Sequence, residues 1–161
     1  MPERVLTEQS FRAVLGRFST GVVLVTAQTP EGPVGVAANS FTSVSLDPPL
    51  VALCAAHTST TWPSIRAADG FAVTILRDVH EEVCRVFATR GADRFSGRDW
   101  VHTPSGHPTL PDGLGWLDCR IEQLVTAGDH EMVVARALDW SLPNEGEPLI
   151  FHSGRYARLA S

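Results

Sequence analysis

The apolar runs of this chain are short, and turn residues rather than long helical segments join most of them. Those expected to be strands are residues 21–27, 34–40, 50–55, 70–76, 116–127, 131–140 and 148–152. Turn residues 29–32 and 128–130 connect two of the successive pairs. Parallel strands need a crossover connection, usually a helix, so an antiparallel barrel or sandwich is favoured over a parallel α/β sheet.

Three short helices are expected as well. Thr7 can cap the first one. The apolar residues of that helix follow one helical stripe and are Phe11, Val14, Leu15 and Phe18. The second helix covers residues 59–68, with Thr61 as its expected cap. The third begins at Asp78, which together with Glu81 resembles a capping box.

The composition indicates a globular chain of one domain. Its 161 residues are 43% hydrophobic and 19% charged, which is sufficient for one core. We therefore expect a single domain over residues 1–161, mainly β with a few short helices. Residues 91–115 are rich in Gly, Pro and Asp, and we expect them to form long loops within this domain.

Charge and hydropathy restrict the partners. The formal net charge of −5 argues against nucleic acid or an anionic membrane surface as a partner. No apolar run approaches the roughly 20 residues that a membrane-spanning helix needs. Residues 1–11 lack the apolar core of a signal peptide, so a cytoplasmic protein is expected.

Neither a metal site nor a hydrolase site is indicated. Cys54, Cys84 and Cys119 are widely spaced, and Cys54 and Cys119 lie in strand-like runs where buried apolar roles are expected. The histidines show no metal-ligand spacing. The chain also lacks the GxSxG and GxGxxG motifs, which disfavours a nucleophile elbow and a Rossmann dinucleotide site.

Short polar side chains cluster at two places. Residues 37–45 contain four Ser or Thr and an Asn beside a predicted strand, and Ser59-Thr60-Thr61 stands at the expected start of a helix. Such residues often serve only to bond nearby backbone in loops. Hydroxyl groups and backbone N–H groups at a helix start can also bind phosphate, and Arg94 adds a planar donor. Because short side chains let a flat ring approach the backbone, the two clusters together indicate a phosphorylated planar cofactor.

The ordered segments resemble the flavin reductase-like family, the short-chain NAD(P)H:flavin oxidoreductases that supply reduced flavin to two-component monooxygenases. The resemblance covers nearly the whole chain. Its principal segment is VGVAANSFTSVSLDPPLVALC, residues 34–54. The other segments are FRAVLGRFSTGVVLVT (11–26), STTW (59–62), FAVTIL (71–76), RFSG (94–97), GHPTLPDGLGWLDCRIE (106–122), GDH (128–130) and PLIFHSGRYARL (148–159).

This resemblance implies an FMN-binding split β-barrel, a Greek-key antiparallel barrel, that forms a homodimer with flavin near the interface. Residues implied to line the isoalloxazine are Ala37, Ala38, Asn39, Ser40, Phe41, Ser43 and Val44. Those implied at the phosphate end are Ser59, Thr60, Thr61, Arg94 and Phe95. Those implied to face the nicotinamide nucleotide are His130, His152, Ser153, Gly154, Arg155 and Tyr156.

Three positions depart from the family pattern. Family members often have Thr in place of Ala37, Asn in place of Thr74 and Gly in place of Ala135. The first change removes a hydroxyl contact to the ring. These changes weaken individual contacts and leave the choice between FMN and FAD open.

The resemblance implies that the chain transfers a hydride from NADH or NADPH to free or loosely bound FMN or FAD. Reduced flavin would then reach a separate monooxygenase component. No strong general acid or base is needed for this step, in agreement with a site of small polar residues. Two alternatives remain open: a flavin carrier or sensor without turnover, since related split barrels bind other cofactors including haem, and a structural barrel that binds no flavin.

Overall fold

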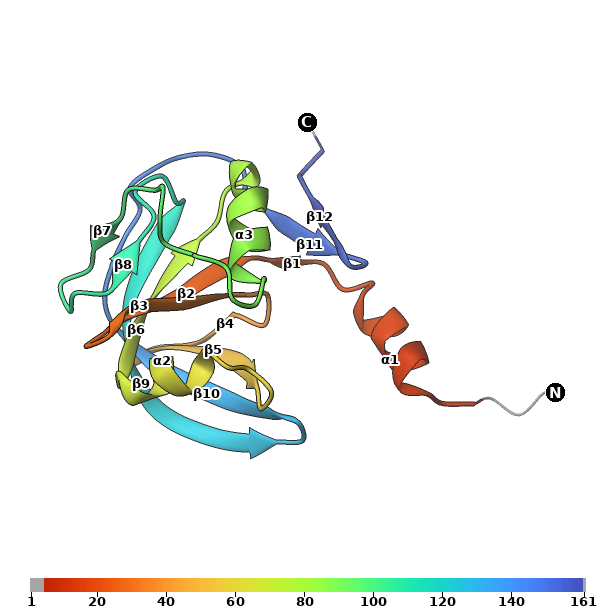
Figure 1. Cartoon of the computed structure of the whole chain (residues 1–161). Helices are drawn as coiled ribbons and strands as arrows, with labels where there is room; N and C mark the ends of the chain where they lie inside the picture. Colours follow the sequence, from red (N-terminus) through yellow and green to blue (C-terminus); the bar gives the residue numbers. More distant parts are fainter. Residues whose placement is uncertain (1–4, 161) are drawn as a thin grey trace.

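The computed structural model describes residues 5–160 (Figure 1). Most strands belong to a seven-stranded sheet in the order β3-β2-β6-β9-β10-β5-β4, in which all neighbouring strands are antiparallel. In chain order they are β2 (Val23–Thr29), β3 (Gly32–Ala38), β4 (Thr42–Leu46), β5 (Pro49–Ala56), β6 (Gly70–Ile75), β9 (Gly115–Ala127) and β10 (His130–Ser141).

The remaining elements are short. One small sheet contains β1 (Thr20–Gly21), β11 (Ile150–His152) and β12 (Arg155–Ala157), and another pairs β7 (Val101–His102) with β8 (Pro108–Thr109). The helices are α1 (Glu8–Leu15), α2 (Trp62–Ala67) and α3 (Glu81–Phe87), and a 3₁₀ turn over Asp78–His80 precedes α3.

The large sheet must curl because its two edge strands follow one another in sequence. The edges are β3 and β4, yet only residues 39–41 separate Ala38 from Thr42. An extended chain advances at most about 3.6 Å per residue, so this connection cannot cross a flat sheet of seven strands. The sheet therefore folds into a barrel that is split between β3 and β4. This confirms the predicted antiparallel split barrel with a few short helices.

The barrel interior is apolar and α2 closes one end of it. Its buried side chains include Val25, Leu53, Phe71 and Val133, and those of α2, Trp62 and Ile65, join the same cluster. A second cluster lies under α3 and contains Leu24, Val83 and Phe87. Strand β2 contributes to both clusters, because successive side chains point to opposite faces: Val25 lies in the barrel interior and Leu24 lies under α3.

Helix α1 extends away from the barrel (Figure 1). The hydroxyl of Thr7 accepts a hydrogen bond from Ser10 N at 3.0 Å, so the predicted cap is confirmed. The predicted apolar stripe does not reach the core: the exposed fractions are 63% for Phe11, 64% for Val14 and 78% for Phe18, which lies beyond the end of α1. Among the described residues, no helix is long and apolar enough to cross a membrane.

The predicted strands all exist, while one predicted cap is wrong and another lacks the expected side-chain bond. Thr61 is the N-cap residue of α2, as predicted, but its side chain makes no capping bond, and its hydroxyl accepts from Arg94. At the third helix, the imidazole of His80 accepts the hydrogen bond of Arg77 N at 2.9 Å. The Asp78–Glu81 capping box is therefore not formed.

Sequence patterns also missed several short strands. The hydroxyl-rich residues of β4 pair with β5, and β7 and β8 lie inside the segment expected to be loops. Cys119 is buried as expected, but Cys54 is only half-buried. Burial raises the pKa of the Cys119 thiol to about 12 and that of Cys84 to about 11.

Candidate functional site

The open edge of β3 gives the site its backbone groups. Gly35 O points away from β2, because it accepts a hydrogen bond from Arg94 Nη1 at 2.7 Å. In an antiparallel pair this orientation repeats every second residue, and β3 pairs with β2 without a register shift. The N–H and C=O of Ala37 therefore also point out of the sheet edge. They can bond a planar ligand.

Ser40 holds the connection between β3 and β4 in place. Its hydroxyl accepts from Cys54 N at 2.9 Å and donates to Cys54 O at 3.2 Å. These two bonds continue the β4–β5 pairing, in which Thr42 faces Ala52, through a side chain. The hydroxyl of Ser40 is thus occupied by β5, and the neighbouring backbone at Asn39 stays at the split of the barrel.

A cavity of about 290 Å³ lies along this connection. It brings together several predicted site residues, namely Ala37, Ala38, Asn39, Ser40, Ser59 and His130. Leu53, Cys54, Ala55 and Trp62 complete much of its lining. Trp62 is 5% exposed and packs edge-on against Phe71, so it is mainly a core residue. Most of the lining residues have short side chains.

The predicted phosphate end forms an adjoining site. The hydroxyl of Ser59 accepts from Thr61 N at 3.3 Å and from Trp62 N at 3.1 Å, and so shapes the turn before α2. Arg94 Nη1 donates to Thr61 Oγ1 at 2.9 Å. A cavity of about 310 Å³ is lined by residues that include Thr60, Thr61, Arg94 and Phe95.

Arg94 lines this cavity, and its guanidinium is a planar cation suited to phosphate. Its Nε is buried and has no hydrogen-bond partner among the described residues. Burial lowers the pKa of this guanidinium from its ordinary value. An anion beside the guanidinium would offset the cost of burying this charge. Phe95, the residue after Arg94, packs with Phe87 and Trp100 in an aromatic cluster. This cluster supports the loop that carries Arg94.

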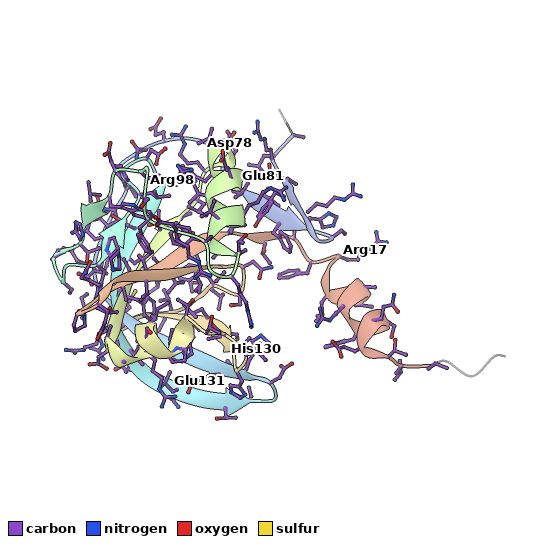
Figure 2. All side chains as sticks on the ribbon, in the orientation of Figure 1. Arg17, Asp78, Glu81, Arg98, His130 and Glu131 are labelled. Carbon is purple, nitrogen blue, oxygen red and sulfur yellow. The ribbon has the colours of Figure 1, made fainter. Side chains whose placement is uncertain are left out.

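His130 lies at the tip of the β9–β10 hairpin (Figure 2). Its Nδ1 is 2.7 Å from Asp129 Oδ1, and this bond lowers the pKa of the Asp129 carboxyl. The pairing leaves Nε2 of the imidazole for another partner. Asp129 O also accepts from His57 N at 2.9 Å, which fixes the hairpin tip to the end of β5.

The other predicted residues lie elsewhere in this chain. Ser43 and Val44 are on exposed parts of β4, and His152, Gly154 and Arg155 are exposed on the β11–β12 hairpin. Figure 1 shows this hairpin well apart from the tip of β9–β10. The chain alone therefore does not bring His130 together with that hairpin, and their shared nicotinamide role stays a prediction.

Two further cavities are both lined in part by Phe151 of β11. One, of about 740 Å³, is lined in part by Leu15, Phe18, Phe41 and Phe151. The other, of about 130 Å³, includes Ala37 and Tyr156. Burial raises the pKa of Tyr156, as does the neighbouring Cys84. Sequence reasoning missed Cys54 and the role of Asp129; the GDH motif indicated His130 but not that Asp129 fixes its imidazole.

Known proteins resemble this chain over nearly its full length. The model of the "Flavin reductase like domain" matches residues 15–160. A flavin reductase of Pseudomonas putida is 41% identical over 95% of this chain and 91% of its own length. The reductase subunit HsaB of a flavin-dependent monooxygenase from Rhodococcus jostii is 39% identical over 92% of this chain and 76% of its own.

Solved structures agree with these sequences. An NADH:FAD oxidoreductase of Streptomyces globisporus, in complex with NAD and FAD fragments, has a TM-score of 0.90 and 34% identity, covering 98% of both chains. A homologue of nitrilotriacetate monooxygenase component B from Mycobacterium thermoresistibile has a TM-score of 0.91 and 35% identity, covering 95% of this chain and 87% of its own. Sequence, fold and the residues at the split of the barrel together place this chain in the flavin reductase-like family.

Proposed function

We propose that this chain is an NAD(P)H:flavin oxidoreductase that reduces free or loosely bound FMN or FAD. The observation that carries the proposal is the open strand edge at Ala37 beside a cavity lined by Arg94 and the hydroxyl residues Thr60 and Thr61. A flavin phosphate fits this cation and these hydroxyls, and its ring fits a shelf of short residues. Residues 1–161 would act as one such domain.

The residues present fit a bound flavin. Backbone groups near Ala37 and Asn39 would bond the ring edge, while Thr60, Thr61 and Arg94 would hold the phosphate. The redox chemistry would come from the bound flavin as acceptor of a hydride from the nicotinamide. The protein therefore needs to align two rings rather than to provide a strong acid or base.

His130 would orient the nicotinamide nucleotide. The bond between its Nδ1 and Asp129 restrains the imidazole, so that Nε2 can face the ligand. A hairpin tip can carry such a residue over a cavity mouth with little disturbance of the core. Exposed residues of the β11–β12 hairpin, His152, Gly154 and Arg155, would contact the nucleotide when a second chain brings them close.

A flavin-dependent monooxygenase is the proposed consumer of the reduced flavin. The names of the relatives support this: HsaB is a reductase subunit of such an enzyme, and a structural neighbour is the flavin reductase component of a tryptophan halogenase. Contact with the oxygenase would be transient, because reduced flavin can also travel by diffusion.

The direct test of this function is NADH oxidation by the purified protein with FMN, FAD or riboflavin. A reductase oxidises many equivalents of NADH per protein when flavin is present in excess. A carrier or sensor binds flavin but leaves NADH unchanged, and that result would overturn the proposal.

We also propose that the chain forms a homodimer. The dimer would provide the second chain that brings the β11–β12 hairpin close to the nucleotide. The apolar stripe of α1 is exposed, and a large cavity between this helix and the barrel is lined by Leu15, Phe18 and Phe41. Exposed apolar faces of this kind mark interfaces. A second chain can cover both and complete the flavin site.

The Phe18→Asp substitution is expected to convert the dimer to a monomer at micromolar concentration, because it places a charge on the apolar stripe. Sedimentation velocity gives the mass, to be compared with 17.4 kDa for one chain. Leu142→Asp is the control, since Leu142 is 85% exposed on another segment. A wild-type protein that sediments as a monomer would contradict the dimer and weaken a flavin site at an interface.

A further inference from the structure

A nearly buried carboxylate stands beside His130 and has no role in the site described so far. Glu131 is the second residue of β10, and its side chain is only 12% exposed. Its direction follows from strand alternation, because Val133 and Ala135 on the same face are buried in the barrel core. Glu131 therefore points into the end of the barrel that α2 closes. His130 is on the opposite face of the strand.

Two bonds connect Glu131 to α2. Its Oε2 accepts from Trp62 Nε1 at 2.8 Å, and its Oε1 accepts from Arg66 Nη1 at 3.2 Å. The indole bond is the more sheltered of the two, since Trp62 is 5% exposed whereas the Arg66 side chain is 55% exposed. A charged group in such a place is costly unless paired, so Glu131 makes a bond that an apolar residue of similar size cannot replace.

The far end of this connection is the turn proposed to bind phosphate. Trp62 N donates to Ser59 Oγ, and the intervening Thr61 accepts from Arg94. Glu131 thus joins the first residues of β10 to the turn of residues 59–61 across the barrel end. The two parts are far apart in sequence. The β10–β5 pairing at His130 and Ala56 and the bond from His57 N to Asp129 O are further connections close to the tip. Figure 2 shows Glu131 and His130 side by side near the end of the hairpin.

We propose that Glu131 is a positioning residue of the reductase, which through Trp62 holds His130 at a fixed place relative to the phosphate-binding turn. Flavin held at residues 59–61 and the nicotinamide oriented by His130 must approach in one geometry for hydride transfer. The bond between Glu131 and Trp62 sets that spacing. This inference rests on the proposed function, because it assigns Glu131 a role in the same reaction.

The experiment compares Glu131→Leu and Trp62→Phe with the wild type. Glu131→Leu removes the carboxylate and Trp62→Phe removes the indole N–H, so each variant lacks the hydrogen bond between these two side chains. Each variant leaves an apolar side chain at the substituted position. We expect both variants to raise the KM for NADH and to slow flavin reduction about three- to tenfold, since the hairpin is loosened but His130 remains. In Glu131→Leu the dissociation constant of FMN should change less than twofold, because the residues proposed to hold flavin are unchanged in this variant.

The matched control is Glu122→Leu on β9. Glu122 pairs with Arg136 at 2.8 Å on an exposed part of the same hairpin, and its loss should leave the NADH dependence unchanged. A double variant with His130→Ala adds a second criterion. If Glu131 acts through His130, then Glu131→Leu costs nothing further in the His130→Ala background.

A readout independent of turnover is hydrogen exchange of the Trp62 Nε1–H, followed by NMR without cofactors. Slow exchange in the wild type that becomes fast in Glu131→Leu supports the bond, and unchanged exchange overturns it. Lost protection with unchanged NADH kinetics overturns the positioning role alone. Failure of the wild type to oxidise NADH with any flavin removes the proposed function and this role together, so the two failures are distinguishable.

Discussion

Replacing His130 by alanine is expected to raise the KM for NADH and to slow flavin reduction by up to about 10²-fold, the loss that follows from a nicotinamide displaced by about 1 Å. Flavin affinity should stay near the wild-type value, because the groups proposed to hold flavin lie on β3 and on the turn before α2. Stopped-flow flavin reduction at several NADH concentrations, beside an FMN titration, measures the two quantities separately.

Two further variants make this result specific. Asp129→Asn removes the charge that restrains the imidazole of His130 and should give a smaller loss of the same kind. His102→Ala changes an exposed histidine on β7 and should have no effect. Wild-type kinetics in His130→Ala would reduce this histidine to a turn residue. A loss of FMN binding instead would mean that the hairpin tip covers the flavin rather than the nicotinamide.

The strands of the barrel were predictable because their side chains are sorted by simple rules. In β9, the alternation of Leu117, Cys119 and Ile121 with charged residues marks a strand, although one of those charged residues, Asp118, is buried and accepts a hydrogen bond from Ser105 N. Strand β4 gave no such signal, because its residues are largely exposed and its pairing with β5 is a tertiary property. The sequence therefore indicated where the cluster of hydroxyls lies but not that Ser40 bonds to Cys54.

The same distinction between local sequence patterns and tertiary contacts explains which parts of the candidate site could be predicted. Single residues with unusual chemistry, such as Arg94 and His130, could be selected from motifs, since each stands beside glycine or a hydroxyl cluster. Contacts between distant residues could not be predicted in this way. Glu131 and Trp62, for example, are far apart in sequence and meet only when α2 closes the barrel. The missing capping bond at Thr61 has a similar origin: Arg94, which comes from another loop, donates to the same hydroxyl.

Replacing Arg94 by alanine is expected to weaken FMN binding by about 10- to 100-fold, since a hydrogen bond to a charged group contributes about 1.5–3 kcal/mol. The structure adds a second reason. Arg94 also donates to Gly35 O, Thr61 Oγ1 and Thr89 O, so its loss loosens the open edge of β3 and the phosphate turn together. Riboflavin has no phosphate and should lose much less affinity.

Comparison of these two flavins separates the direct contact from the framework role of Arg94. Arg94→Lys keeps the charge but cannot reach three carbonyl and hydroxyl acceptors in a planar arrangement, so an intermediate loss for FMN is expected. Arg90→Ala is the matched control, because Arg90 is exposed and its one bond, to Thr58 O, is long at 3.4 Å. It removes the same formal charge from the same loop. Titration of each variant with FMN and riboflavin gives the result: equal losses for both flavins in Arg94→Ala would leave it a framework residue and move the phosphate elsewhere.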